Sequence, residues 1–176
     1  MRRAIFLIAF IAASAHARVL MTREQALAFA FPAGSRVVRE TFFLSDAQLD
    51  DARKESGVPF NDQLIIRYAG YSGDRLLGYA YFDGHRVRTL PETVMVVVAA
   101  DGSVDRVDIL SFDEPMDYFP KRRWIDQLLH RKLDKDLSLT GAIRPISGAS
   151  LTGRAIVDAT RKVLALHHVV AGATPR

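Results

Sequence analysis

The chain has 176 residues, of which 49% are hydrophobic and 25% are charged. This length suits one domain with a sizeable core, and this balance excludes both a disordered chain and a fibrous repeat. The sequence has no cysteine, which excludes haem attached through cysteines, thiolate-ligated iron–sulfur clusters and cysteine zinc sites.

Residues 1–17 have the layout of a secretory signal peptide. Arg2 and Arg3 give a positive start, an apolar run follows, and small residues lie before the expected cleavage point after Ala17. The apolar run is shorter than the roughly 20 residues of a membrane-spanning helix. We therefore expect export to the periplasm or to the outer side of the cytoplasmic membrane; retention as an uncleaved anchor is the alternative.

Cleavage would leave only a mild positive charge. The segment holds two of the 24 basic residues and none of the 20 acidic ones, so the net charge falls from +4 to +2. Charge therefore gives no support to nucleic-acid binding.

Two helices are predicted early in the chain. Thr22 and Ser45 each precede a glutamine by three residues, which is the spacing of a capping box. Pro32 and Gly34 end the first helix, and Gly57 suits the C-terminal cap of the second.

The middle of the chain is rich in strand patterns. Asp83-Gly84 predicts a turn, and Asp101-Gly102 predicts a hairpin. Consecutive strands joined by short turns favour an antiparallel sheet. The four predicted strands are 64–68, 76–82, 93–99 and 104–112.

Helical patterns return towards the C-terminus, over Lys121–Leu133 and over Gly153–His168. The order of elements predicts an α+β fold, a single domain in which helices pack on an antiparallel β-sheet. The chain divides into a signal peptide at 1–17, an N-terminal helical segment at 18–60, the main domain at 61–171 and a C-terminal tail at 172–176.

Small residues and hydroxyls gather before the last helix, in Ser147-Gly148-Ala149-Ser150-Leu151-Thr152. Small side chains let a bulky ligand approach the backbone, and Gly148 can adopt a positive φ. The free N–H groups of a helix N-terminus favour a phosphate. Serine and threonine are also ordinary helix caps, so these residues alone leave capping and phosphate binding open, with capping the commoner.

The order of these residues resembles the S/T-G-A-T-x-T/S signature of the FMN-binding domain family. That family includes the C subunit of the sodium-pumping NADH:quinone reductase and the G subunit of the Rnf complex. Leu77-Gly78-Tyr79-Ala80, Glu114-Pro115 and Trp124 are similar to further family features in the same order. The resemblance implies that 61–171 is an FMN-binding domain and that the cofactor is bound by Ser147, Gly148, Ala149, Ser150, Leu151 and Thr152.

In that family an extracytoplasmic flavin transferase esterifies FMN to the hydroxyl after the alanine, which here implies Ser150. The chain departs from the signature at two positions. Serine replaces the usual threonine at 150, and Arg144 stands where the family carries aspartate. Arg144 either weakens recognition by the transferase or pairs with the FMN phosphate.

The resemblance implies an exported electron carrier or redox subunit, which would exchange electrons with a membrane or periplasmic redox partner and have no substrate of its own. The alternative is a non-redox binding or assembly module of the same fold that has lost covalent flavin. A hydrolase using Ser150 is disfavoured because no glycine lies two residues before it.

Other residues have a functional and a plainer interpretation. The carboxylates at 113–117 suit a solvated turn better than acid–base chemistry. Trp124 suits the core better than a flavin-stacking role. Lys121-Arg122-Arg123 suits a solvated helix face better than a docking patch. His167-His168 are adjacent, so they point apart on a helix, and the sequence predicts no metal site.

Overall fold

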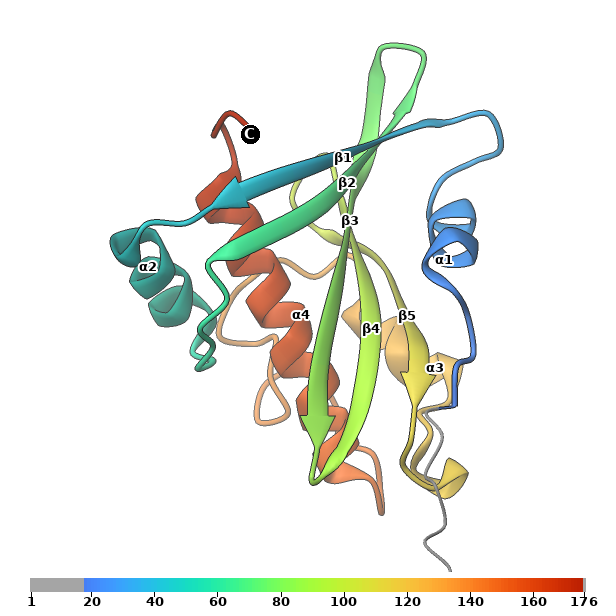
Figure 1. Ribbon diagram of the computed structural model, residues 1–176. Coiled ribbons are helices and arrows are strands. Elements are labelled where there is room, and N and C mark those ends of the chain that lie inside the picture. Colours follow the sequence, from blue (N-terminus) through green and yellow to red (C-terminus); the bar gives the residue numbers. More distant parts are fainter. Residues whose placement is uncertain (1–17, 176) are drawn as a thin grey trace, which may run out of the picture.

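A computed structural model describes residues 18–175 (Figure 1). The predicted signal peptide lies outside these residues. The fold is α+β, as predicted, with five strands, four α-helices and two short 3-10 helices: α1 (Arg23–Ala30), β1 (Arg36–Phe43), α2 (Asp46–Ser56), β2 (Leu64–Ser72), β3 (Arg75–Val87), β4 (Leu90–Ala99), β5 (Val104–Phe112), η1 (Met116–Tyr118), α3 (Arg122–Ile125), η2 (Asp126–Leu128) and α4 (Ser150–Val170).

The five strands form one antiparallel sheet in the order β1-β2-β3-β4-β5. Successive side chains of a strand point to opposite faces, so the sheet has two cores. The larger core lies between the sheet and α2, α3 and α4, and the smaller one lies under α1 (Figure 1). Among the described residues, no helix is long and apolar enough to span a membrane.

The predicted caps of the first two helices are confirmed. Thr22 and Ser45 each form a complete capping box with the glutamine three residues later. Gly57 closes α2 in the left-handed conformation at φ 70°. The hairpin at Asp101-Gly102 is also present, with Gly102 at φ 81°.

The structure differs from the prediction in one turn and one strand. The turn expected at Asp83-Gly84 is absent, because β3 continues to Val87 and pairs with β4 along that whole length. Strand β1 was not predicted; it lies within the segment 18–60 and pairs with β2.

The helix predicted over 121–133 was also wrong in its extent. Only α3 and η2 form, because the chain then returns to the edge of the sheet. The His130 N–H donates to the Val104 carbonyl at 2.7 Å, and the Val104 N–H donates to the Arg131 carbonyl at 2.9 Å. These tertiary hydrogen bonds outweigh the local helical pattern.

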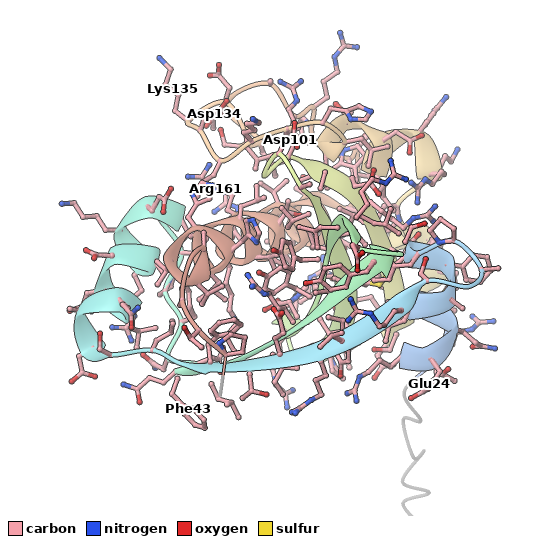
Figure 2. The ribbon with its side chains drawn as sticks, turned by 90° about the horizontal axis from the view of Figure 1, so that it is seen from above. Glu24, Phe43, Asp101, Asp134, Lys135 and Arg161 are labelled. Carbon is pink, nitrogen blue, oxygen red and sulfur yellow. The ribbon has the colours of Figure 1, made fainter. Side chains whose placement is uncertain are left out.

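Helix α4 is anchored to the loops around it by Arg161. Its guanidinium donates to the Ser56 carbonyl at the end of α2 at 2.7 Å and to the carbonyls of Asp134 and Leu137 at 2.6 and 3.1 Å. Figure 2 shows the side chain reaching from α4 towards the loop that carries Asp134. One cation thus binds three carbonyls and fixes the segment that leads towards α4.

Candidate functional site

The segment singled out by the sequence forms a tight turn followed directly by a helix. The Ala149 N–H donates to the Ile146 carbonyl at 3.2 Å, and Gly148 lies in the left-handed region at φ 80°. Helix α4 then begins at Ser150, three residues before the predicted start at Gly153. A Cβ at position 148 would meet nothing within 4 Å, so glycine is favoured here by the positive φ and not by a lack of space.

The capping interpretation does not hold for this helix. The N-cap of α4 is Ala149, and no side chain makes a capping hydrogen bond there. An uncapped 21-residue helix leaves N–H groups of its first turn for another acceptor, and its dipole favours an anion there. The structure therefore leaves the phosphate-binding interpretation open and removes the plainer one.

The motif residues differ in exposure. Ser147, Gly148 and Ser150 are exposed, and Leu151 is 48% exposed. Ala149 and Thr152 are buried. Of the three hydroxyl-bearing residues, only the two serines are therefore open to a ligand or an enzyme, and the family-based acceptor Ser150 is one of them.

Trp124 is a core residue that contacts the segment before α4. Its indole N–H donates to the Arg144 carbonyl at 2.6 Å, and the Arg144 N–H donates to Gln127 Oε1 at 2.9 Å. A Cβ on Gly153 would lie 3.2 Å from Trp124 Cζ2, so glycine allows α4 to approach the indole closely. The core interpretation of Trp124 is confirmed by its burial.

The Arg144 side chain itself is exposed and lies over a hollow that it shares with Arg123, Trp124 and Gln127. It does not line the pocket next to Leu151 that is described below.

That pocket, of about 300 Å³, lies beside the first half of α4, and Leu151 of the motif forms part of its wall. The end of β3 and the segment after α2 complete it. The apolar lining consists of Val58, Pro59, Phe60, Val87, Leu151, Ala155 and Ala159; the charged lining consists of Asp83, His85, Arg86, Arg88, Arg154, Asp158 and Lys162.

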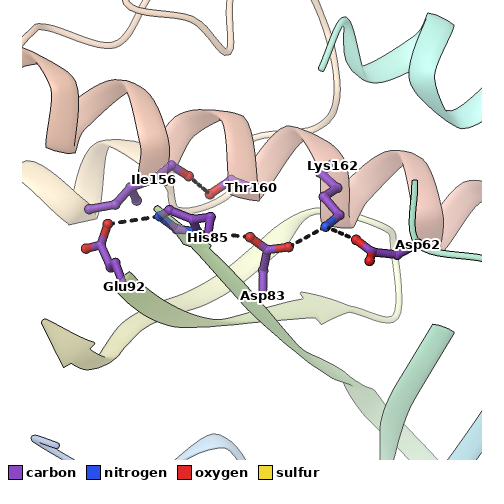
Figure 3. Close-up of polar contacts among 7 residues, drawn as sticks. All are labelled: Asp62, Asp83, His85, Glu92, Ile156, Thr160 and Lys162. Atoms are coloured by element: carbon purple, nitrogen blue, oxygen red, sulfur yellow. Dashed lines mark hydrogen bonds and ion pairs between the residues drawn. The ribbon is translucent and has the colours of Figure 1, made fainter. Parts of the chain in front are cut away.

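One wall of the pocket is part of a chain of ion pairs that joins β3, β4, α4 and the segment before β2 (Figure 3). His85 Nδ1 lies 3.0 Å from Asp83 Oδ2, and His85 Nε2 lies 2.9 Å from Glu92 Oε2. Lys162 Nζ lies 2.8 Å from Asp83 Oδ1 and 2.7 Å from Asp62 Oδ2. The carboxylates of Asp83 and Glu92 are buried.

These contacts shift the titration of the group. Burial by itself lowers the pKa of His85, but hydrogen bonds and attraction from Asp83 and Glu92 outweigh it and raise that pKa to about 9. Burial raises the pKa of Asp83, and the contacts with His85 and Lys162 bring it below its usual value. The pKa of Lys162 is raised: burial opposes this, and Asp83 and Asp62 more than compensate.

This wall was not predicted from the sequence, because Asp83 was assigned to a turn. A usable signal was present: in a continued strand, residues 81, 83, 85 and 87 share one face, and the first and last of these are apolar. Charged residues between them on the core-facing side indicate a buried polar group. Glu92 lies on the neighbouring strand, and no sequence pattern predicts its pairing with His85.

Arg88 at the tip of the β3–β4 hairpin closes one end of the pocket. It is a non-glycine residue at φ 53°, and it donates to Glu114 Oε2 at 2.8 Å and lies 4.9 Å from the Tyr118 ring centroid. The solvated-turn interpretation of residues 113–117 is therefore wrong for Glu114, which is buried and paired. Its carboxylate balances Arg88 instead.

The remaining candidates are occupied in different ways. All three residues of the basic triplet are exposed, and Arg122 is paired with Asp108 and Asp126. His167 is buried against Tyr81, and His168 pairs with Glu55 on the surface. The described part of the chain contains no group of three or more histidine and acidic residues that could hold a metal ion.

The chain matches no model of a known protein family, and no curated protein matches it either. The likeness to the FMN-binding domains therefore remains a prediction that rests on the motif and its surroundings.

Proposed function

We propose that this protein is an exported FMN-binding electron carrier or redox subunit, with the FMN phosphate at the N-terminus of α4. The observation that carries the proposal is the exposed hydroxyl of Ser150 as the first residue of an uncapped helix, beside a pocket partly lined by Leu151. Uncapped N–H groups and the helix dipole favour a phosphate at this position.

The lining of the pocket supports binding of the rest of such a cofactor. Its volume of about 300 Å³ falls at the lower end of small-molecule sites. Its apolar surfaces, which include Phe60 and Val87, suit a flat aromatic ring. Arg86, Arg88 and Arg154 add positive charge around it, which favours an anionic ligand.

When bound, FMN supplies the electron transfer, and the protein positions it. For covalent attachment, the flavin transferase would join the Ser150 oxygen to the FMN phosphorus of FAD. The bond between that phosphorus and the oxygen bridging to AMP breaks, AMP leaves, and the hydroxyl proton passes to a base of the transferase or to water. Ser150 replaces the family's threonine, and either residue offers a hydroxyl for this ester.

Intact-mass measurement tests the attachment. Protein made with a flavin transferase should gain the mass of one FMN, and the increment should survive denaturation. Ser150→Ala should abolish it. Thr140→Ala is the matched control, because it removes an exposed hydroxyl that lies outside the motif. Thr152→Ala should also keep the flavin, since Thr152 is buried. A covalent flavin on the Ser150→Ala protein would show that the acceptor position is wrong.

The redox role has its own test. Reduced, flavin-loaded protein should be reoxidised by a membrane or periplasmic partner, and salt should slow the reaction if exposed cations such as Lys121 and Arg123 steer an acidic partner. A flavin that no such partner reduces or oxidises would contradict the electron-transfer role.

The non-redox binding or assembly module stays as the second candidate because of Arg144. Its main chain is held by Trp124 and Gln127, but its exposed side chain offers no carboxylate where the family signature has one. Colourless protein after expression with an active transferase would favour that candidate.

A further inference from the structure

The buried wall of the pocket plays no part in the proposal above. Its inner members are Asp83 and His85 of β3, Glu92 of β4 and Lys162 of α4, and their side chains are 6%, 18%, 1% and 14% exposed. Figure 3 shows His85 lying between the two carboxylates beneath α4. The charges of these two anions and two cations must compensate one another, because an unpaired buried charge is energetically costly.

The geometry requires a proton in each of the two contacts between His85 and a carboxylate. Each ring nitrogen faces a carboxylate oxygen, at 3.0 Å for Asp83 and 2.9 Å for Glu92. A neutral imidazole has one N–H and would turn a lone pair towards the other carboxylate. A proton shared in this group resides on the imidazole rather than on a carboxyl, since the imidazole is the more basic. The titration described above, with the pKa of His85 at about 9, agrees with this argument.

Glu92 depends on this proton alone. Its Oε2 pairs with His85, and its Oε1 is the one buried side-chain nitrogen or oxygen without a hydrogen-bond partner among residues 18–175. No other described side chain forms an ion pair with Glu92. Loss of the His85 proton would therefore leave Glu92 as an uncompensated buried anion.

Other charged groups face the same place from α4. Lys162 is shared between Asp83 and the exposed Asp62, so it cannot replace His85 as the partner of Glu92. Asp158 and Arg154 lie nearer the N-terminus of the same helix and line the pocket. Burial raises the pKa of Asp158, and Arg154, Arg161 and His85 oppose that shift.

We propose that His85 is a positioning residue of the pocket: as an imidazolium between Asp83 and Glu92 it neutralises the buried wall, so that the arginines at the rim set a positive potential for an anionic ligand. The identity of that ligand as FMN rests on the proposed function. With His85 neutral, the wall would carry a net negative charge and repel an anion. The pocket should therefore take up anions well below pH 9 and poorly above it.

The first experiment follows the imidazoles by NMR in the full protein made without a flavin transferase. His85 should titrate at about 9. Glu92→Gln should bring its pKa back towards the ordinary 6.5, because an uncharged amide no longer stabilises the imidazolium. Glu55→Gln is the matched control: it removes the carboxylate of the exposed pair with His168 and should leave His85 unchanged. A wild-type His85 that titrates near 6.5 would overturn the inference.

The second experiment measures binding of two anionic aromatic probes, FMN and 8-anilinonaphthalene-1-sulfonate, by fluorescence at pH 7 and pH 10. Both should bind the wild type more weakly at pH 10, by on the order of tenfold, which is the size of one charge interaction in a site partly open to water. Glu92→Gln and His85→Gln should each change this pH dependence, whereas Glu55→Gln should preserve it. A wild-type affinity that stays constant through pH 9 would overturn the inference.

The two probes separate this inference from the proposed function. If the dye shows the loss of affinity near pH 9 and FMN does not bind at any pH, the flavin proposal fails and the role of His85 stands. If FMN binds with an affinity that neither pH nor Glu92→Gln changes, the flavin proposal stands and the role of His85 fails.

Discussion

Acidification should destabilise this protein through His167, a buried histidine that stays neutral in the native state. His167 is 8% exposed, and its Nδ1 lies 2.9 Å from the Tyr81 hydroxyl oxygen. Burial lowers the pKa of His167 to about 4, helped by repulsion from Arg67 and His168. In the unfolded chain the same ring would titrate near 6.5.

The sign follows from these two values. The folded-state pKa lies below the unfolded one, so the contribution of a neutral His167 is fully present above pH 6.5 and is lost as the pH falls towards 4. The difference between about 4 and 6.5 corresponds to about 3 kcal/mol of unfolding free energy. That is a large part of the stability of an ordinary domain, which is about 5–15 kcal/mol.

Urea denaturation of wild type and His167→Gln at pH 7.5, 5.5 and 4 measures this effect. Glutamine can still accept from the Tyr81 hydroxyl but cannot take up a proton, so the variant should lose about 3 kcal/mol less than the wild type over this range. Subtracting the two profiles removes the contribution of the carboxylates that both proteins share. Parallel profiles for the two proteins would refute the reasoning, as would an NMR titration of His167 near 6.5.

Three further outcomes are expected. For His85 the pH dependence has the opposite sign: its pKa is raised to about 9, so its contribution to stability is fully present below pH 6.5 and is lost as the pH rises through 9. Urea denaturation at pH 7 and pH 10 should show a loss of about 3 kcal/mol of unfolding free energy in the wild type, and His85→Gln should lack this loss. Gly153→Val should destabilise the protein by about 1–3 kcal/mol, because the valine side chain would meet Trp124 and Ile146. The same change at Gly148, where there is space for a side chain, should act through backbone strain and leave the near-ultraviolet signal of Trp124 unaltered. Arg144→Asp should raise the flavinylated fraction without weakening non-covalent FMN binding, because the Arg144 side chain lies outside the pocket; a fall in FMN occupancy would instead indicate that Arg144 binds the phosphate.

Local patterns in the sequence determined the elements whose ends are fixed by hydrogen bonds between nearby residues. The capping boxes at Thr22 and Ser45, the left-handed cap at Gly57 and the hairpin at Asp101-Gly102 all follow from hydrogen bonds within a few residues. The segment 147–152 was likewise recognisable, because small residues and hydroxyls before a helix are a local feature. Consecutive strand patterns joined by short turns, with helical patterns before and after them, were enough to predict an antiparallel sheet with helices packed on it.

Tertiary contacts decided the rest. Helix α4 begins at Ser150 rather than at the predicted Gly153, because the turn at Gly148 and the hydrogen bond from Trp124 position the chain for a helix there. No local cap marked that point in the sequence. Residues 129–133 left the helical pattern because their backbone pairs with Val104, which is distant in the sequence. The wall formed by Asp83, His85 and Glu92 exists only because β3 continues past Gly84. This continuation brings β3, β4 and α4 together. Charge pairing between separate elements depends on distances that local sequence patterns do not reveal, so the sequence could indicate the motif at the start of α4 but not the charged pocket beside it.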